Sequence, residues 1–338
     1  MVLQINDGAF RLSPRRIVDT PGRSPMTLLK PCGVWPATLV PFQASGEIDQ
    51  EALLTHLTSV SAVAGVQGVV VNGEAGQVSS LTPEERCSVI NLAKRVCGDR
   101  LPVIAGVVAG DPGTARSLAR EAQASGADGI LLFPITSPGE QWGDRQAVIS
   151  IVGSIAESSG MPMVLFQVAA SQAGSYPPDI LRNLCSEVDA VVGVKEGSND
   201  PVLYEVNLRN LRSLRRHVSV LSTNTQWLLA SLAIGADGVI SGIGSVAAEV
   251  LVEIFDAMQA GRLEQARLIG DRLFPLNRAF YGPGLTDCHT RMKLALQMLG
   301  RLDSTAVRPP LLPLPDAEAA SIRSALLAAG LLQPSVDV

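Results

Sequence analysis

The chain has 338 residues, of which 46% are hydrophobic and 17% charged, and its formal net charge is -5. This length and apolar content suffice for a large core, which excludes a small disulfide-stapled scaffold and permits one large barrel or two ordinary domains. The acidic balance, and basic residues that are not interleaved with aromatic ones, argue against a nucleic-acid partner.

Eight short apolar segments, rich in β-branched residues, predict buried strands. In chain order they are residues 34–40, the end of 64–71, 103–107, the end of 125–132, 163–166, 191–195, 218–222 and the end of 234–241. The segments 64–71, 125–132 and 234–241 share one pattern, in which a helix-ending glycine, a short turn and a second glycine precede a run of branched aliphatics. The same helix-to-strand joint is therefore used repeatedly.

Helical periodicity lies between these strands, for example over 50–63, 115–125, 226–233 and 247–260. Strands that alternate with helices, at a spacing of roughly 25 to 35 residues, favour an α/β fold of the (β/α)8 TIM-barrel type. No Gly-x-Gly-x-x-Gly turn follows the first strand, which disfavours an open dinucleotide-binding sheet. Pro36 cannot donate to a strand ladder, so we expect a bulge or a late strand start there.

The pattern divides the chain into three units. Residues 1–30 carry little periodicity and are predicted as an N-terminal extension, and residues 31–260 as the barrel. Residues 261–338 are predicted as a C-terminal helical unit, with helices over 263–280, 290–299 and 317–331 and a proline-rich connector over 308–315.

Cysteine and histidine are sparse and scattered. Close pairs and metal-type spacings are absent among the five cysteines, which is typical of reduced thiols in a cytoplasmic protein: Cys32, Cys87, Cys97, Cys185 and Cys288. Each of the three histidines stands alone in sequence, so we expect no metal site and no cofactor. Neither a long apolar run nor an export signal is present, so we expect no membrane span.

Lys195, one of four lysines in the chain, ends the apolar run 191–195 and is followed by Glu196 and Gly197. A buried strand that ends on an amine delivers one polar group to the mouth of a pocket. Removal from water disfavours the charged amine, so its pKa falls and more of it is nucleophilic toward a carbonyl carbon. We predict Lys195 as an imine-forming nucleophile; the alternative is that it bends to solvent or pairs with Glu196.

Further site candidates follow the other strands, because the active site of a (β/α)8 barrel lies at the C-terminal strand ends. The loop after the second strand carries Glu74 as its only ionisable side chain, and its backbone amides are suited to a carboxylate. The predicted substrate-binding residues follow the second, fourth, fifth and eighth strands: Gly73, Ala75, Gly76, Pro134, Phe166, Gln167, Ser241, Gly242 and Ile243.

Two other segments allow more than one interpretation. The stretch 241–245, Ser-Gly-Ile-Gly-Ser, is suited either to phosphate binding by backbone amides or to a plain turn that needs small residues. The charged residues of 287–293 are expected to form a capped helix start that faces solvent or a neighbouring subunit, or else to reach the site.

Several motifs in order resemble one known family. They are Ala-Thr-Leu-Val-Pro-Phe at 37–42, Gly-Glu-Ala-Gly-Gln at 73–77, Leu-Thr-Pro-Glu-Glu-Arg at 81–86, Pro-Val-Ile-Ala-Gly at 102–106, Gly-Val-Lys-Glu at 193–196 and the segment 235–241. From about Gly33 to the C-terminus the chain resembles the dihydrodipicolinate synthase and N-acetylneuraminate lyase superfamily of class I, Schiff-base aldolases. The resemblance implies a (β/α)8 barrel with a helical C-terminal unit, a homodimer or homotetramer, and an imine between Lys195 and a 2-oxo acid such as pyruvate.

The chain departs from that family at the proton relay. The loop 73–77 lacks the two hydroxyl residues of the family's Gly-Thr-Thr-Gly-Glu, and Phe166 stands where relatives have the proton-shuttling tyrosine. Gln172 stands in place of a carboxylate-binding arginine, and Ile135 and Thr136 replace an aromatic pair. Because phenylalanine cannot carry protons, we expect Glu74 to act as the acid-base group.

The sequence thus predicts an aldolase, lyase or dehydratase that acts on pyruvate or another 2-oxo acid through Lys195, and lysine synthesis itself is disfavoured by the missing tyrosine and arginine. A second hypothesis is a barrel that binds a small carboxylic acid without catalysis. A third is a phosphate-handling barrel that uses the 241–245 turn. The first is favoured because a buried lysine is costly to keep without a partner or a task.

Overall fold

The computed structural model describes residues 29–135, 145–284 and 286–333. Isolated bridges from Val34 to Val66 and from Ala37 to Val70 close an eight-stranded parallel sheet into a ring. The predicted (β/α)8 TIM barrel is confirmed. Its strands follow the order β1-β8-β7-β6-β5-β4-β3-β2 and span β1 (Gly33–Pro36), β2 (Val69–Val71), β3 (Val103–Val107), β4 (Gly129–Leu132), β5 (Met163–Gln167), β6 (Val191–Glu196), β7 (Ser219–Ser222) and β8 (Gly238–Ser241).

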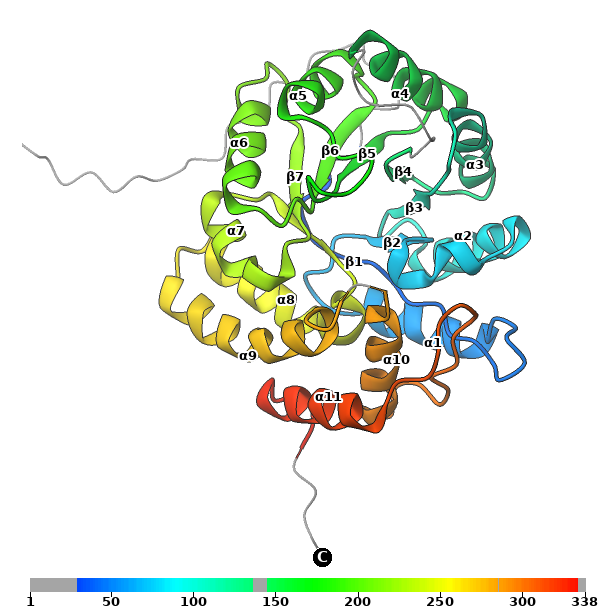
Figure 1. Ribbon diagram of the computed structural model, residues 1–338, viewed down its shortest axis with the longest axis vertical. Coiled ribbons are helices and arrows are strands. Elements are labelled where there is room, and N and C mark those ends of the chain that lie inside the picture. Colours follow the sequence, from blue (N-terminus) through cyan, green and yellow to red (C-terminus); the bar gives the residue numbers. More distant parts are fainter. Residues whose placement is uncertain (1–28, 136–144, 285, 334–338) are drawn as a thin grey trace, which may run out of the picture.

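Helices surround the strands (Figure 1). Proline at the first turn and acidic or hydroxyl N-caps start several of them, as at α2, where Thr82 and Glu85 form a capping box. They span α1 (Gln50–Ser61), α2 (Pro83–Cys97), α3 (Pro112–Ala124), α4 (Arg145–Ser159), α5 (Pro178–Glu187), α6 (Pro201–Arg212), α7 (Leu228–Ile234) and α8 (Gly244–Gln259).

Pro36 is the last residue of β1, so the strand is shorter than the predicted 34–40. Between the two bridges, β1 advances three residues (34 to 37) while the β2 segment advances four (66 to 70). The register thus shifts by one residue beside the proline, which fits the predicted bulge and not a late strand start, since β1 begins at Gly33.

Three helices follow the barrel: α9 (Leu263–Tyr281), α10 (Cys288–Met298) and α11 (Asp316–Ala328). They pack on one another, and α9 and α10 also pack on α8 (Figure 1). Helix α10 contacts the short 3-10 helix η2 (Glu74–Gly76) of the β2 loop as well. The division of the chain at residues 30 and 260 stays a prediction. Most of the predicted extension 1–30 lies outside the described residues, as does Thr136.

We expected the charged start of α10 to face solvent or a neighbouring subunit, but its side chains are largely buried. His289, Arg291 and Lys293 are all buried. The Arg291 guanidinium donates to Glu318 of α11 and, at 3.1 Å, to the carbonyl oxygen of Phe280 at the end of α9. Arg291 therefore holds the C-terminal helices together.

Candidate active site

Lys195 lies near the C-terminal end of β6 with only 7% of its surface exposed. Its register partner on β5 is Phe166, whose ring centroid lies 4.1 Å from the Lys195 Nζ atom. The Phe133 ring packs edge-on against Phe166 with the centroids 5.1 Å apart. The amine is therefore presented beside an aromatic wall, and the alternative in which it bends to solvent is wrong.

Burial lowers the pKa of Lys195 from 10.5 to about 8, and Glu74 and Cys288 act in the opposite direction. Burial also raises the pKa of the Cys288 thiol to about 12, so this group is uncharged near neutral pH. Glu74 is then the nearby anion that matters to Lys195. A lysine with a pKa near 8 keeps an appreciable neutral fraction, which is the nucleophilic form.

Glu196, the other proposed partner of Lys195, is engaged elsewhere. Successive strand residues point to opposite faces, so its carboxylate lies on the outer face of β6. There it accepts hydrogen bonds from Asn224 at 2.9 Å and Asn207 at 3.2 Å. Burial raises the pKa of this carboxyl. Glu196 thus holds Asn224 in the segment after β7, and it does not form an ion pair with the Lys195 amine.

The β2 loop folds into η2 immediately after an extended Gly73. Ala75 and Gly76 are buried, whereas Glu74 is exposed and lies near enough to Lys195 and Cys288 to act on both of their pKa values. The structure therefore brings this predicted loop and the predicted nucleophile to the same end of the barrel.

Gln77 anchors the loop to the C-terminal helices. Its Oε1 atom accepts a hydrogen bond at 2.8 Å from Lys293 of α10, whose amine also donates to the Ala306 carbonyl oxygen at 2.8 Å. The Lys293 amine lies 4.3 Å from the Phe42 ring centroid, and burial lowers its pKa to about 7. Placement of the β2 loop thus depends on a second buried amine.

The turn after β8 is closely packed. A Cβ atom added at Gly242 would lie 3.3 Å from both the Ala75 Cβ and the Met292 Cε atoms. The Ser245 hydroxyl bonds the Leu39 amide and the Ala37 carbonyl oxygen. Protein atoms already fill this turn, which disfavours the phosphate-binding interpretation. Ser241 and Ile243 are both buried, and the Ser241 hydroxyl accepts from the Ile243 amide at 3.4 Å.

Two residues near the site were missed by the sequence analysis. The Tyr281 hydroxyl, at the end of α9, lies 3.4 Å from the Cβ position of Gly242. Cys288, the first residue of α10, interacts electrostatically with Lys195 and with Tyr281. Tyrosine is rare in this chain, with three in all, and that rarity is the one sequence signal that singles out Tyr281.

Two predicted substrate-binding residues serve the loop after β5 instead. The side-chain amide of Gln167 exchanges hydrogen bonds with Ser175 and with the Tyr176 backbone, and it lies on the strand face opposite to Phe166. A Cβ atom at Gly174 would lie 2.4 Å from the Pro134 Cβ atom, so Pro134 packs against the same loop. Gln167 is thus turned away from the Lys195 face, and its contact with substrate stays a prediction that this geometry disfavours.

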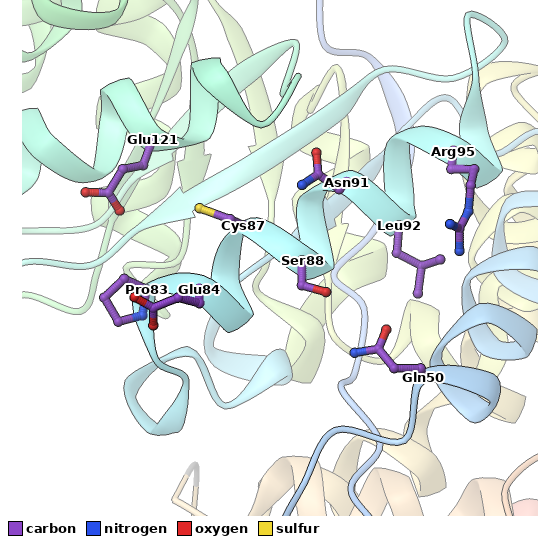
Figure 2. A pocket seen from close by; sticks show the side chains of 9 residues that line it. All are labelled: Gln50, Pro83, Glu84, Cys87, Ser88, Asn91, Leu92, Arg95 and Glu121. Atoms are coloured by element: carbon purple, nitrogen blue, oxygen red, sulfur yellow. The ribbon is translucent and has the colours of Figure 1, made fainter.

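Two surface hollows lie away from Lys195. One, of about 670 Å³, is bordered by α2 with Gln50 of α1 and Glu121 of α3, as Figure 2 shows. The other, of about 680 Å³, lies between α9 and α11. Active sites of (β/α)8 barrels lie at the C-terminal strand ends, so the candidate site is the surroundings of Lys195 and not these outer grooves. In the described parts of the chain no group of three His, Cys, Asp or Glu is placed to hold a metal ion.

Known proteins share this architecture. The Dihydrodipicolinate synthetase family matches residues 30–329. The chain is 32% identical over 294 residues to a 4-hydroxy-tetrahydrodipicolinate synthase of Methanothrix thermoacetophila, covering 87% of this chain and 95% of the relative. It is 28% identical over 305 residues to an uncharacterized DapA-like lyase of Pyrobaculum islandicum, covering 89% and 99%. The crystal structure of dihydrodipicolinate synthase from Thermotoga maritima matches with a TM-score of 0.82 at 25% identity, covering 90% of this chain and 100% of that one.

A closed (β/α)8 barrel with a buried amine at the end of its sixth strand places this chain among the barrel proteins whose sites lie at the C-terminal strand ends. The chain belongs to the Dihydrodipicolinate synthetase family. No helix in the described ranges combines the length and apolarity that a bilayer crossing needs.

Proposed function

We propose that this member of the family is a Schiff-base-forming lyase that acts on pyruvate or another 2-oxo acid. The observation that carries the proposal is the buried Lys195 amine, which burial brings to a pKa of about 8. Within the described part of the chain no carboxylate lies in salt-bridge range of this amine, so it is available for a carbonyl carbon. The family membership and the names of the relatives support a lyase.

In the proposed reaction Lys195 attacks the 2-oxo carbon and loses water to form an imine. The Phe166 ring, 4.1 Å from the amine, supplies a π-face that favours the cationic imine over bulk water. Glu74 acts as an acid-base group that accepts a proton from the Lys195 ammonium. The substrate carboxylate is proposed to lie against the backbone of Gly73, Ala75 and Gly76 in the β2 loop.

The acceptor is proposed to differ from that of the relatives named 4-hydroxy-tetrahydrodipicolinate synthase. Phe166 has no proton to transfer, and Gln172, which stands where a carboxylate-binding arginine is expected, is exposed and accepts from the Ala169 amide. Loss of those two groups favours a sugar acid or another 2-oxo compound as substrate.

The test is reduction with borohydride in the presence of pyruvate and a panel of other 2-oxo acids, with the adduct mapped by mass spectrometry. An adduct on Lys195 supports the proposal, and Lys195→Ala provides the matched negative control. Thermal stabilisation by an acid without any adduct would instead support the second hypothesis, a barrel that binds a small carboxylate without catalysis.

We further propose that the protein is a homodimer or homotetramer. Helix α9 exposes three large apolar side chains, Leu263, Leu268 and Phe274, each more than half exposed. Exposed apolar side chains of this kind gain free energy when a second copy covers them. Light scattering coupled to size-exclusion chromatography gives the mass directly, and a monomer at micromolar concentration would refute this assignment.

A further inference from the structure

The imine chemistry needs a proton carrier beside the substrate, and the inference that follows rests on the proposed function. The aromatic side chains that line the Lys195 amine, Phe133 and Phe166, have no exchangeable proton. Glu74 acts on Lys195 electrostatically, but it is exposed on its loop. A hydroxyl group held at the strand ends would supply the proton carrier that these side chains lack.

Three tyrosines are available in the chain, and two are used elsewhere. The Tyr204 hydroxyl donates at 3.0 Å to the Ser231 carbonyl oxygen of α7, where it is fully buried. Tyr176 is a buried residue of the loop that follows β5, near Cys185. Tyr281 is the remaining one, and its hydroxyl lies at the end of β8.

The position of the Tyr281 hydroxyl is fixed by the turn after β8. It lies 3.4 Å from the Cβ position of Gly242, and hydrogen bonding to the Ser241 side chain and the Ile243 amide favours its ionised form. Burial outweighs these bonds and raises the pKa of Tyr281, so the phenol is protonated near neutral pH. The same Gly242 position touches Ala75 of the β2 loop, next to Glu74.

Cys288 lies near both this phenol and the nucleophile. A charge on its thiol would act on Tyr281 and on Lys195, and Glu74 acts on the thiol in turn. Helices α9 and α10 therefore bring two protonated groups to the same end of the barrel as the Lys195 amine. Both come from the C-terminal helical segment, and neither comes from a barrel strand.

We propose that Tyr281 is a second proton carrier of the Lys195 reaction, beside Glu74. The amine adds to the 2-oxo carbon, the carbonyl π pair moves to oxygen, and a proton moves from nitrogen to that oxygen. Tyr281 protonates the resulting hydroxyl, the C–O bond breaks with loss of water, and the nitrogen lone pair completes the C=N bond of a cationic iminium. The phenolate then removes a proton from C3, which gives the neutral enamine and restores the phenol.

The experiment measures exchange of the C3 protons of pyruvate for deuterium by NMR, because this exchange reports enamine formation without any acceptor. Tyr281→Phe should slow the exchange by about 100-fold or more, the usual size of an acid-base contribution, while the borohydride adduct on Lys195 still forms. The matched control is Tyr204→Phe, which also removes one buried hydroxyl and should exchange at close to the wild-type rate. Adding Phe166→Tyr to Tyr281→Phe should restore part of the exchange, which a structural defect would not allow.

The outcomes separate the two proposals. Trapping on Lys195 with unchanged exchange in Tyr281→Phe would overturn the role of Tyr281 and leave the lyase in place. Failure of the wild-type protein to trap pyruvate or any other 2-oxo acid would overturn the proposed function and this inference together. If Tyr281→Phe does not fold, Ser241→Ala carries the test by removing a hydrogen-bond partner of the phenol. Slower exchange in that variant, with the adduct retained, supports Tyr281, and a wild-type rate refutes it.

Discussion

Replacement of Glu74 by glutamine should shift the pH dependence of imine formation downward. A lysine with a pKa of 10.5 is about 0.03% neutral at pH 7, whereas one with a pKa of about 8 is about 9% neutral, a gain of about 300-fold in the nucleophilic form. Burial produces this shift and Glu74 opposes it. Without that anion the pKa of Lys195 falls further, so a larger neutral fraction is present at pH 7.

The assay is the initial rate of borohydride trapping with pyruvate between pH 6 and pH 10. The rate should rise with pH to a midpoint near 8 in the wild-type protein, and the midpoint should lie lower in Glu74→Gln. Turnover should be lost in the same variant because the acid-base group is gone. Glu51→Gln is the control: this exposed residue of α1 is not among the charges that act on Lys195. A wild-type midpoint near 10.5, an upward shift in Glu74→Gln, or full turnover in it would refute the reasoning.

Three stability predictions concern other buried groups. Gln77→Glu should raise the free energy of unfolding by about 1–3 kcal/mol, because Lys293 gains a charged acceptor and the unpartnered buried Gln77 Nε2 donor disappears. The melting temperature should rise with it, and a lower melting temperature would contradict this. Burial lowers the pKa of His56 to about 4, so the fold should lose roughly 3 kcal/mol as the pH falls from 6.5 toward 4, and urea titrations of His56→Leu should show a smaller loss. Gly106→Ala would place a Cβ atom 2.1 Å from the Asn72 carbonyl oxygen, so calorimetry should show a loss of about 1–3 kcal/mol, and wild-type stability would show that this backbone yields.

The barrel could be predicted because its strands and joints are local patterns. Runs of branched aliphatics gave the strands, and glycines such as Gly65, Gly126 and Gly235 mark the helix ends, where each adopts a positive φ angle. The candidate nucleophile Lys195 could be singled out for the same reason, since it ends one of these runs. Loop placement was harder: nothing local indicates that α9 ends against Gly242 or that α10 begins near Lys195.

The placement of Gln167 away from the Lys195 amine has a specific physical cause. We took both Phe166 and Gln167 as site residues because both end the fifth strand, but a period of two puts them on opposite faces. Only the residue in register with Lys195 faces the amine, and that residue is Phe166. The buried charges of α10 were misread because an amphipathic pattern does not show which charges are paired inside, as Arg291 is with Glu318.

The β2 loop differs from the family pattern in the position of its one carboxylate. The family pattern Gly-Thr-Thr-Gly-Glu and this chain's loop 73–77 each contain a single acidic residue, but here it stands at Glu74 instead of at the last position. A carboxylate at position 77 would lie against Lys293, since the Gln77 Oε1 atom accepts from that amine at 2.8 Å. Its removal leaves Lys293 with neutral acceptors and a pKa of about 7, while Glu74 becomes an anion that acts on Lys195. The loop thus keeps one negative charge but places it where it acts on Lys195, and the proposed acid-base role of Glu74 rests on this position.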